Sequence, residues 1–210
     1  MKKLFIFDVD DVMYDLKHII QKALTLETGK DIHHEDWFSF NLNTVYDVDI
    51  KVIFDAFHKH DILNNGVLNF DIYKVVDSLK QSGVETLALT ARGWHPKGEE
   101  ITQAFFENNK IDMDNIKVVQ HHESKSDYIA SLKDYEIIGY VDDNAKHIHQ
   151  TKQLLGEDIQ KYFLRNQPWN RSYDTLELGN INRINSLLEI NTHLENILTK
   201  SNKKVNKNLL

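Results

Sequence analysis

The 210-residue sequence predicts an α/β fold: a Rossmann-like, doubly wound parallel sheet with a small inserted α-helical cap. After Gly83, short apolar segments alternate with amphipathic segments, which is typical of the strands and helices of βαβ units. One further strand lies at the start of the chain, and about 60 residues of helical character separate it from these units, too many for a simple crossover. Polar residues follow the strands, as they do where an α/β sheet binds a ligand.

The first half of the chain is expected to contain one strand and the cap. Residues 3–8 form a short buried strand, because four apolar residues precede the first aspartate. Apolar residues then recur at helical spacing from Leu16, with Gly29 as a stop, and two more helices end before the turn at 64–66 and before Gly83. The predicted boundaries are 1–13 and 69–192 for the α/β core, 14–68 for the cap, and 193–210 for a partly disordered C-terminal tail.

The second half is expected to supply the rest of the sheet. Its strands are predicted at residues 86–90, 116–120, 137–143 and 159–164. Its helices are predicted at residues 98–109, at 124–132, after residue 143 as far as Gly156, and from about Ile181 onwards. These strands are expected to be parallel, because a helix connects each one to the next.

The composition is ordinary for a globular protein, with 41% hydrophobic and 27% charged residues. The net charge of −7 argues against binding to a nucleic-acid polymer or to an anionic membrane. The sequence contains no cysteine, which excludes disulfides and thiolate chemistry. The apolar run Leu4–Phe7 is shorter than the roughly 7–15 residues of a signal-peptide core, so we expect a cytoplasmic protein.

Candidate functional side chains follow four of the predicted strands and should meet at one edge of the sheet. In chain order they are Asp8 and Asp10, Thr90, Lys125, and Asp142 with Asp143. Asp8 and Asp10 are two residues apart, so their side chains point to the same side of an extended backbone. Carboxylates this close resist joint ionisation, and a hard divalent cation such as Mg²⁺ would relieve their repulsion. The alternative is that these acids are helix caps or solvated loop residues.

The sequence around Thr90 and Lys125 indicates an anion site. Lys125 is expected at the first position of a helix that Ser124 caps, where a cation opposes the helix dipole unless an anionic ligand binds there. Thr90 ends an apolar strand beside the backbone N–H groups of the turn at Ala91 and Arg92. Its hydroxyl can bind a phosphate oxygen, and Arg92 either clamps a phosphate or covers the surface.

Taken in order, these residues resemble the motifs of the haloacid dehalogenase superfamily of phosphotransferases. "FDVDDV" (7–12) is similar to the first motif, "LALTARG" (87–93) to the second, Lys125 to the third and "YVDDN" (140–144) to the fourth. The insert between the first two motifs matches the position of the family's helical cap, which closes over small substrates and excludes water. Asp11 stands where many members carry glycine, and we give it no catalytic role.

The resemblance implies a Mg²⁺-dependent phosphomonoesterase that acts through an aspartyl-phosphate intermediate. Asp8 would be the nucleophile, and Asp10 would protonate the leaving oxygen and then activate water. The phosphoryl oxygens would be held by Thr90, Ala91, Arg92 and Lys125. The metal would be held by the carboxylates of Asp8 and Asp142, by the backbone carbonyl of Asp10, and in support by Asp143.

The C-terminal part resembles a narrower group, the 5′(3′)-deoxyribonucleotidase-like branch. The similarity lies in "VDDNAKHI" (141–148), "NQPWNRSYD" (166–174) and "INRINSLLEI" (181–190). It implies that the substrate is a (deoxy)nucleoside monophosphate, with Asn170 and Arg171 either bordering the site or forming a packed surface turn. The aromatic residues Trp37, Phe38, Phe40 and Trp94 are candidates to stack on the base; alternatively, the cap aromatics fill the core of the cap.

Other functions remain alternatives. A phosphatase for another small ester, such as a sugar phosphate, would use the same motifs, and a catalytically silent relative would bind a phosphorylated ligand without hydrolysing it. A signalling receiver domain also uses aspartates, a threonine and a lysine around Mg²⁺. Receivers place the paired acids and the phosphate acceptor on different strands, so both the motif order and the cap insert count against one. The eleven histidines are interpreted as solvated surface residues.

Overall fold

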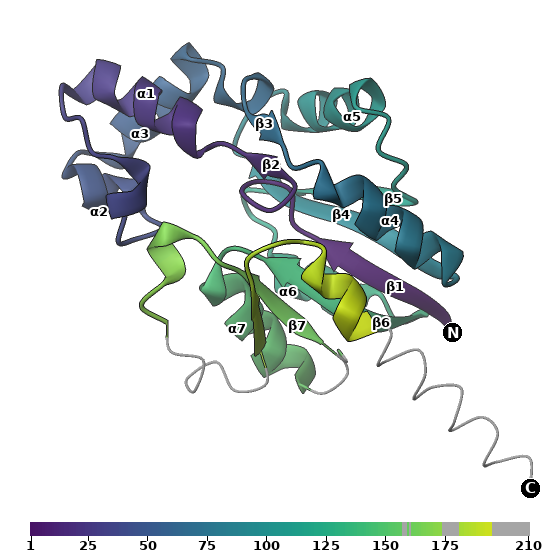
Figure 1. The fold of residues 1–210 in the computed structure, drawn as a ribbon. Coiled ribbons are helices and arrows are strands. Elements are labelled where there is room, and N and C mark those ends of the chain that lie inside the picture. Colours follow the sequence, from purple (N-terminus) through teal and green to yellow (C-terminus); the bar gives the residue numbers. More distant parts are fainter. Residues whose placement is uncertain (157–158, 160, 174–180, 195–210) are drawn as a thin grey trace, which may run out of the picture.

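The computed structural model describes residues 1–156, 159, 161–173 and 181–194 of the chain. Within them, six strands form one sheet in the order β5–β4–β1–β6–β7–β8, and each pair of neighbours is parallel (Figure 1). The strands are β1 (Lys2–Phe7), β4 (Val84–Gly93), β5 (Asn115–Gln120), β6 (Tyr135–Asp142), β7 (Tyr162–Arg165) and β8 (Ile181–Ile184). This arrangement confirms the predicted doubly wound α/β fold, with β1 at its centre.

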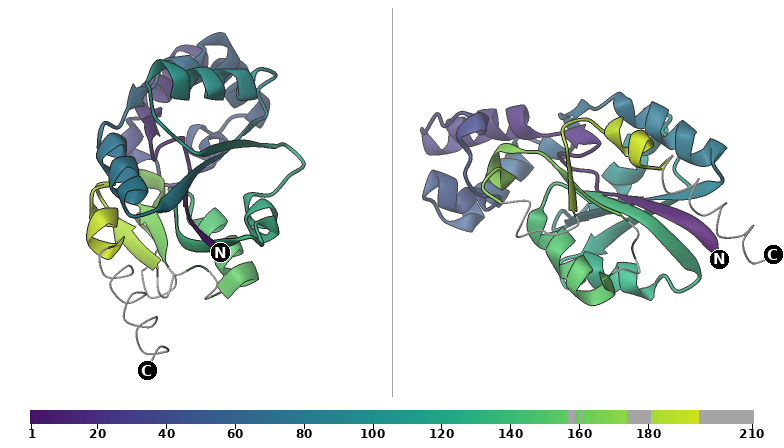
Figure 2. Two further views of the ribbon diagram at one scale, coloured as in Figure 1. Left: turned by 90° about the vertical axis from the view of Figure 1, so that its right-hand side faces the viewer. Right: turned by 60° about the horizontal axis from the view of Figure 1, so that its bottom comes forward.

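Helices cover both faces of the sheet (Figures 1 and 2). One face carries α4 (Asp71–Gln81), α5 (Gly98–Asn108) and the helical residues 189–194, and the other carries α6 (Lys125–Ser131) and α7 (Ala145–Leu155). The side chains of β1 alternate between these layers: Phe5 and Phe7 belong to the first apolar cluster, and Leu4 and Ile6 to the second. Burial on both faces explains the continuous apolar run before Asp8.

Residues 14–68 form a helical insert beyond the carboxyl end of β1 (Figure 1). Its elements are α1 (Lys17–Thr28), η1 (His34–Asp36), α2 (Leu42–Tyr46), α3 (Ile50–Lys59) and η2 (Ile62–Asn64). Gly29 ends α1 in the left-handed conformation with φ 69°, as its predicted role as a stop requires. The chain enters and leaves the insert through two short antiparallel strands, β2 (Tyr14–Asp15) and β3 (Val67–Leu68).

The prediction of a last helix from about Ile181 is wrong, because residues 181–184 form β8 at the edge of the sheet. The apolar residues of this region fit a helical period, but the free edge of β7 offers backbone partners, and Ile181 and Ile184 are buried there. The strand predicted at 159–164 begins only at Tyr162. Of the predicted tail, residues 195–210 lie outside the described residues.

The segment after β7 forms one further short helix, η4 (Pro168–Asn170). Among the described residues, every helix is too short or too polar to cross a lipid bilayer.

Candidate active site

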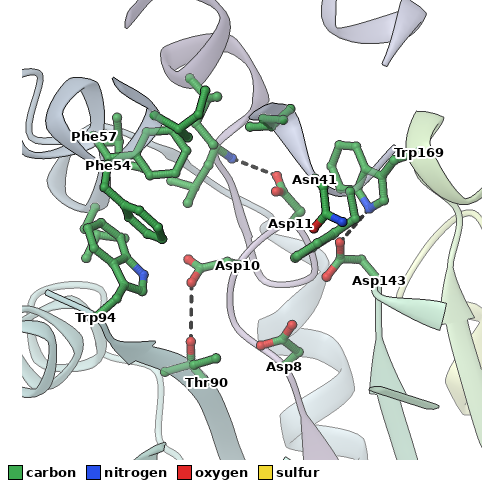
Figure 3. A pocket seen from close by; sticks show the side chains of 18 of the residues that line it. Asp8, Asp10, Asp11, Asn41, Phe54, Phe57, Thr90, Trp94, Asp143 and Trp169 are labelled. Carbon is green, nitrogen blue, oxygen red and sulfur yellow. Dashed lines mark hydrogen bonds between the residues drawn. The ribbon is translucent and has the colours of Figure 1, made fainter. Parts of the chain in front are cut away.

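The carboxyl ends of the central strands meet the helical insert at a cavity of about 350 Å³ (Figure 3). Asp8 follows β1 directly, Thr90 lies near the end of β4, and Lys125 is the first residue of α6. Asp142 ends β6, and Asp143 follows it. Because β1 lies between β4 and β6, the sheet order brings these residues together although they are far apart in the sequence.

Lys125 is the buried centre of this group. Its ammonium lies 2.7 Å from a carboxylate oxygen of Asp8 and 2.9 Å from one of Asp142. The three side chains are almost fully buried. Ser124 accepts a hydrogen bond from the backbone N–H of Asp127 and so caps α6, as predicted. Lys125 is therefore stabilised at its helix start by two carboxylates, which offset the unfavourable helix dipole.

Burial and charge separate the pKa values of these groups. Burial raises the pKa of Asp8 to about 7, with the charge of Asp142 adding to the rise and Lys125 opposing it. Burial also opposes ionisation of Asp142, but Lys125, His147 and a hydrogen bond from Tyr140 lower its pKa overall. For Lys125, burial opposes the charged form, yet Asp142 and Asp8 outweigh it and raise the pKa. Near neutral pH, Asp142 and Lys125 are therefore charged, while Asp8 is divided between its two forms.

Asp8, Asp142 and Asp143 form a buried carboxylate cluster. One oxygen from each lies within 4.8 Å of those from the other two. Burial, with the charges of Asp142 and Asp8, raises the pKa of Asp143. When all three acids are ionised, one ammonium does not compensate their charge, and hard oxygen donors of this kind suit Mg²⁺. The residues thus fit the divalent cation expected from the sequence, while Asp10 directs its carboxylate elsewhere, towards Arg92.

The segment after β7 holds Asp143 in place. Trp169 donates its indole N–H to the Asp143 carboxylate at 2.9 Å, and Asn170 donates its amide to the Asp143 backbone carbonyl at 2.7 Å. Gln167 and Asn170 cap η4 reciprocally, and Arg183 of β8 donates to the Asn170 side chain at 2.8 Å. Asn170 is therefore a buried structural residue that supports the acid cluster.

The same segment contacts the helical insert. Arg171 forms an ion pair with Glu35 of η1, and the ring of Trp169 lies 6.0 Å from that of Trp37, centroid to centroid. Arg171, which the sequence placed either at the border of the site or in a surface turn, thus links the core to the insert at the exposed surface. Through Trp169, one side chain contacts both the insert and Asp143.

Asp10 is held by Arg92 and Thr90. Arg92 Nη2 lies 2.6 Å from Asp10 Oδ1 and Nε lies 3.0 Å from Oδ2, while the Thr90 hydroxyl donates to Oδ2 at 3.3 Å. The guanidinium is fully buried and lies 5.7 Å and 5.9 Å from the ring centroids of Tyr14 and Phe105. Arg92 was expected either to clamp a phosphate or to cover the surface. Neither role agrees with the structure, because its Nε and Nη2 donate to Asp10 and its side chain is buried. The turn predicted at Ala91 and Arg92 is wrong, because β4 continues as far as Gly93; Ala91 does line the cavity.

The four aromatic candidates occupy different places. Trp37, Phe40 and Trp94 line the cavity, with Trp37 buried and Phe40 exposed at its rim. Phe38 is 65% exposed and lines a separate hollow instead, so its expected contact with the substrate has no support in this geometry. Asp11 accepts a hydrogen bond from the backbone N–H of Leu16 and has a positive φ of 56°, which fits a turn residue.

Several cavity residues were not identified from the sequence. The spacing of Phe54 and Phe57 predicts a helix with one buried face, but it does not reveal that this face borders a cavity. Asn41 gives no sequence signal beyond a loop position. His147 lines the cavity with its Nδ1 3.4 Å from Asp142, and His34 is 5% exposed, so the interpretation of all histidines as surface residues is wrong.

No protein-family model and no curated protein sequence matches this chain. Its structure is similar to that of a predicted phosphatase from Clostridium acetobutylicum (16% identity, TM-score 0.62, 93% of this chain and 99% of that one covered). It is also similar to a protein provisionally named β-phosphoglucomutase from Thermotoga maritima (13%, 0.61, 93% and 99%). A third, from Bacteroides fragilis, is provisionally named a haloacid dehalogenase-like hydrolase (14%, 0.61, 90% and 100%). At these identities, the similarity establishes a shared fold.

Proposed function

We infer that this chain, which has the fold of the haloacid dehalogenase-like hydrolases, is a Mg²⁺-dependent phosphomonoesterase acting on a small phosphate ester. The observation that carries the proposal is the pair of Asp8 and Lys125, a buried carboxylate and a buried ammonium 2.7 Å apart on the floor of a cavity. A carboxylate that attacks a phosphate dianion needs positive charge beside it, and Lys125 supplies that charge.

The proposed roles combine the family resemblance with the positions of the groups. Asp8 attacks phosphorus, the bond to the ester oxygen breaks, and the leaving oxygen takes a proton from Asp10. Water activated by Asp10 then attacks the aspartyl phosphate, which releases phosphate and restores the Asp8 carboxylate. Thr90, the backbone N–H of Ala91 and Lys125 bind the phosphoryl oxygens during both steps. Arg92 holds the Asp10 carboxylate through hydrogen bonds from its Nε and Nη2 and so acts as a positioning residue.

The carboxylates of Asp8 and Asp142, supported by Asp143 and the Asp10 backbone carbonyl, would hold Mg²⁺. Bound there, the ion would neutralise charge on the transferring phosphoryl group. The buried, closely spaced oxygens of the acid cluster support this assignment.

The names of the similar structures support a small substrate. One is named for a phosphatase and another for β-phosphoglucomutase, so the names favour a sugar phosphate or a comparable ester over the nucleotide that the C-terminal resemblance implies. The cavity volume of about 350 Å³ is of the size that holds a small molecule.

The proposal predicts that purified protein releases phosphate from p-nitrophenyl phosphate only when Mg²⁺ is present. Asp8→Asn should abolish the release, because an amide cannot form the covalent intermediate. Asp134→Asn makes the same chemical change at an exposed position outside the cavity and should retain full activity. Full activity in Asp8→Asn would disprove the covalent mechanism. Absence of turnover in the wild-type protein, with phosphate binding retained, would favour a non-catalytic relative.

A further inference from the structure

Four acids line the cavity, and the proposed reaction uses three of them. Asp8 and Asp10 take part in the two chemical steps, and Asp143 supports the metal site. Each of these three carboxylates is held by a side chain of another element through an ion pair or a hydrogen bond. The fourth acid is Asp11. Within the described part of the chain its carboxylate forms no ion pair, and Lys17, the lysine nearest to it in sequence, donates to other side chains.

The turn at Asp11 does not require a charged side chain. Its oxygen Oδ1 accepts a hydrogen bond from the backbone N–H of Leu16 at 3.0 Å, and its φ of 56° lies in the left-handed region. Glycine and asparagine both adopt this region, and the amide oxygen of an asparagine can accept the same hydrogen bond. Both local functions of the side chain are therefore independent of its charge. In the part of the chain that the structure describes, the second oxygen, Oδ2, accepts no hydrogen bond.

Asp11 lies where the floor of the cavity meets an apolar wall. It follows the reacting acids of the floor and lies just before the helical insert, and Figure 3 shows it near Asn41. Of the twelve residues that the insert contributes to the cavity, eleven are aliphatic or aromatic, and the exception is Asn41. Covering a carboxylate beside such a wall is unfavourable unless a cation or a donor pairs with it. The alcohol part of a bound ester is the group that would cover Asp11.

The chemistry of this corner selects between kinds of alcohol. A hydrocarbon alcohol would cover Asp11 without giving it a partner, and the hydroxyls of a sugar would lie against the apolar wall without partners. A quaternary ammonium group avoids both costs, because its charge pairs with the carboxylate and its methyl groups need no hydrogen bond from the wall. Aromatic rings attract such a cation further, and the insert contributes four of them to the cavity, in Trp37, Phe40, Phe54 and Phe57.

We propose, on the basis of the function inferred above, that Asp11 is a specificity-determining residue. The substrate is the phosphate ester of an alcohol that carries a quaternary ammonium group, and this group pairs with the Asp11 carboxylate while its methyl groups pack against the apolar wall. The inference narrows the small phosphate ester proposed above. It differs from both a sugar phosphate and a nucleotide, since the alcohol parts of those esters carry no ammonium group.

The test compares phosphocholine with 3,3-dimethylbutyl phosphate, which has a neutral carbon in place of the nitrogen and nearly the same shape. With Mg²⁺ present, we expect kcat/KM for phosphocholine to exceed that for the neutral ester by about tenfold or more. Similar values, or hydrolysis of p-nitrophenyl phosphate but of neither alkyl ester, would overturn the inference and leave the phosphatase function standing. Absence of turnover with all three esters would reject the proposed function itself, and the inference with it.

Variants separate recognition of the charge from its effect on the leaving group, because the two esters are the same for every protein. Asp11→Asn keeps the acceptor for Leu16 and removes the charge, and it should reduce the ratio of kcat/KM between phosphocholine and the neutral ester by about tenfold. The ratio is measured on one protein sample, so it does not depend on the fraction that is correctly folded. Asp47→Asn makes the same change at an exposed position outside the cavity that also has a positive φ, 48°, and should preserve the ratio. An unchanged ratio in Asp11→Asn would refute the assignment of Asp11.

Discussion

The raised pKa of Asp8 means that the proposed nucleophile destabilises the metal-free protein above neutral pH. Asp8 is 5% exposed, and burial together with the charge of Asp142 raises its pKa from 3.8 to about 7. The folded state therefore holds a proton on this group that the unfolded chain has already lost. The stability that this proton contributes is fully present below the pKa of Asp8 in the unfolded chain. It is lost as the pH rises through the pKa of Asp8 in the folded protein.

The magnitude follows from the two pKa values. A rise from 3.8 to about 7 corresponds to about 4 kcal/mol in the free energy of unfolding, of which about 3 kcal/mol is lost between about pH 5 and pH 8. Asp8→Asn removes the titrating group while keeping the shape of the side chain. The variant should therefore lose about 3 kcal/mol less than the wild-type protein over this range.

Urea denaturation in EDTA measures this difference directly, with free energies of unfolding determined at several pH values for both proteins. Asp134→Asn, at an exposed position, should follow the wild-type profile. Adding Mg²⁺ at about pH 8 should stabilise the wild-type protein more than Asp8→Asn, because the ion binds the folded state through this carboxylate. Parallel pH profiles for wild type and Asp8→Asn would refute the reasoning that burial and neighbouring charge raise this pKa.

Three further predictions concern the Asp10 carboxylate, the acid cluster and the packing of the sheet. Arg92→Lys keeps the charge but loses the two-point contact with Asp10. The kcat for p-nitrophenyl phosphate should therefore fall by about tenfold or more, while KM changes less. Equal effects on kcat and KM would contradict a positioning role for Arg92. Trp169→Phe removes the hydrogen bond to the Asp143 carboxylate, and calorimetric titration should show Mg²⁺ binding weakened by about tenfold. An unchanged affinity for Mg²⁺ would show that Trp169 does not support the metal site. Gly139→Ala would place a methyl group 2.3 Å from the ring of Phe5, and urea denaturation should show a loss of about 1–3 kcal/mol; an equally stable variant would contradict the close packing of β1 and β6.

The sequence was sufficient to predict five of the six strands of the sheet and the functional residues at their ends, because both depend on local patterns. The apolar run before Asp8, the capped helix start at Lys125 and the acids after β6 each lie within a few residues of the pattern that identifies them. Arg92 is different. Strand alternation puts it on the same side as Thr90, but only the fold shows that Asp10 lies within 2.6 Å and occupies its donors.

The remaining features depend on contacts between distant segments. Trp169 meets Asp143 only because the loop after β7 folds back over the end of β6, and no local spacing predicts that contact. Residues 181–184 form a strand because the edge of β7 is available to them, which overrides their helical spacing. The apolar face of α3 is evident from the sequence, but whether it packs on protein or borders a cavity is decided by tertiary structure.

The short ribbon of β2 and β3 has a mechanical consequence. The two chain segments that join the insert to the core are hydrogen-bonded to each other, so they restrict its position more than two independent linkers would, in addition to the contacts that Arg171 and Trp169 make with it. Tyr14 belongs to this ribbon. Its backbone forms an isolated β-bridge with Asp10, and the guanidinium of Arg92 lies over its ring. The ribbon that carries the insert is therefore joined directly to Asp10 and to the arginine that holds it.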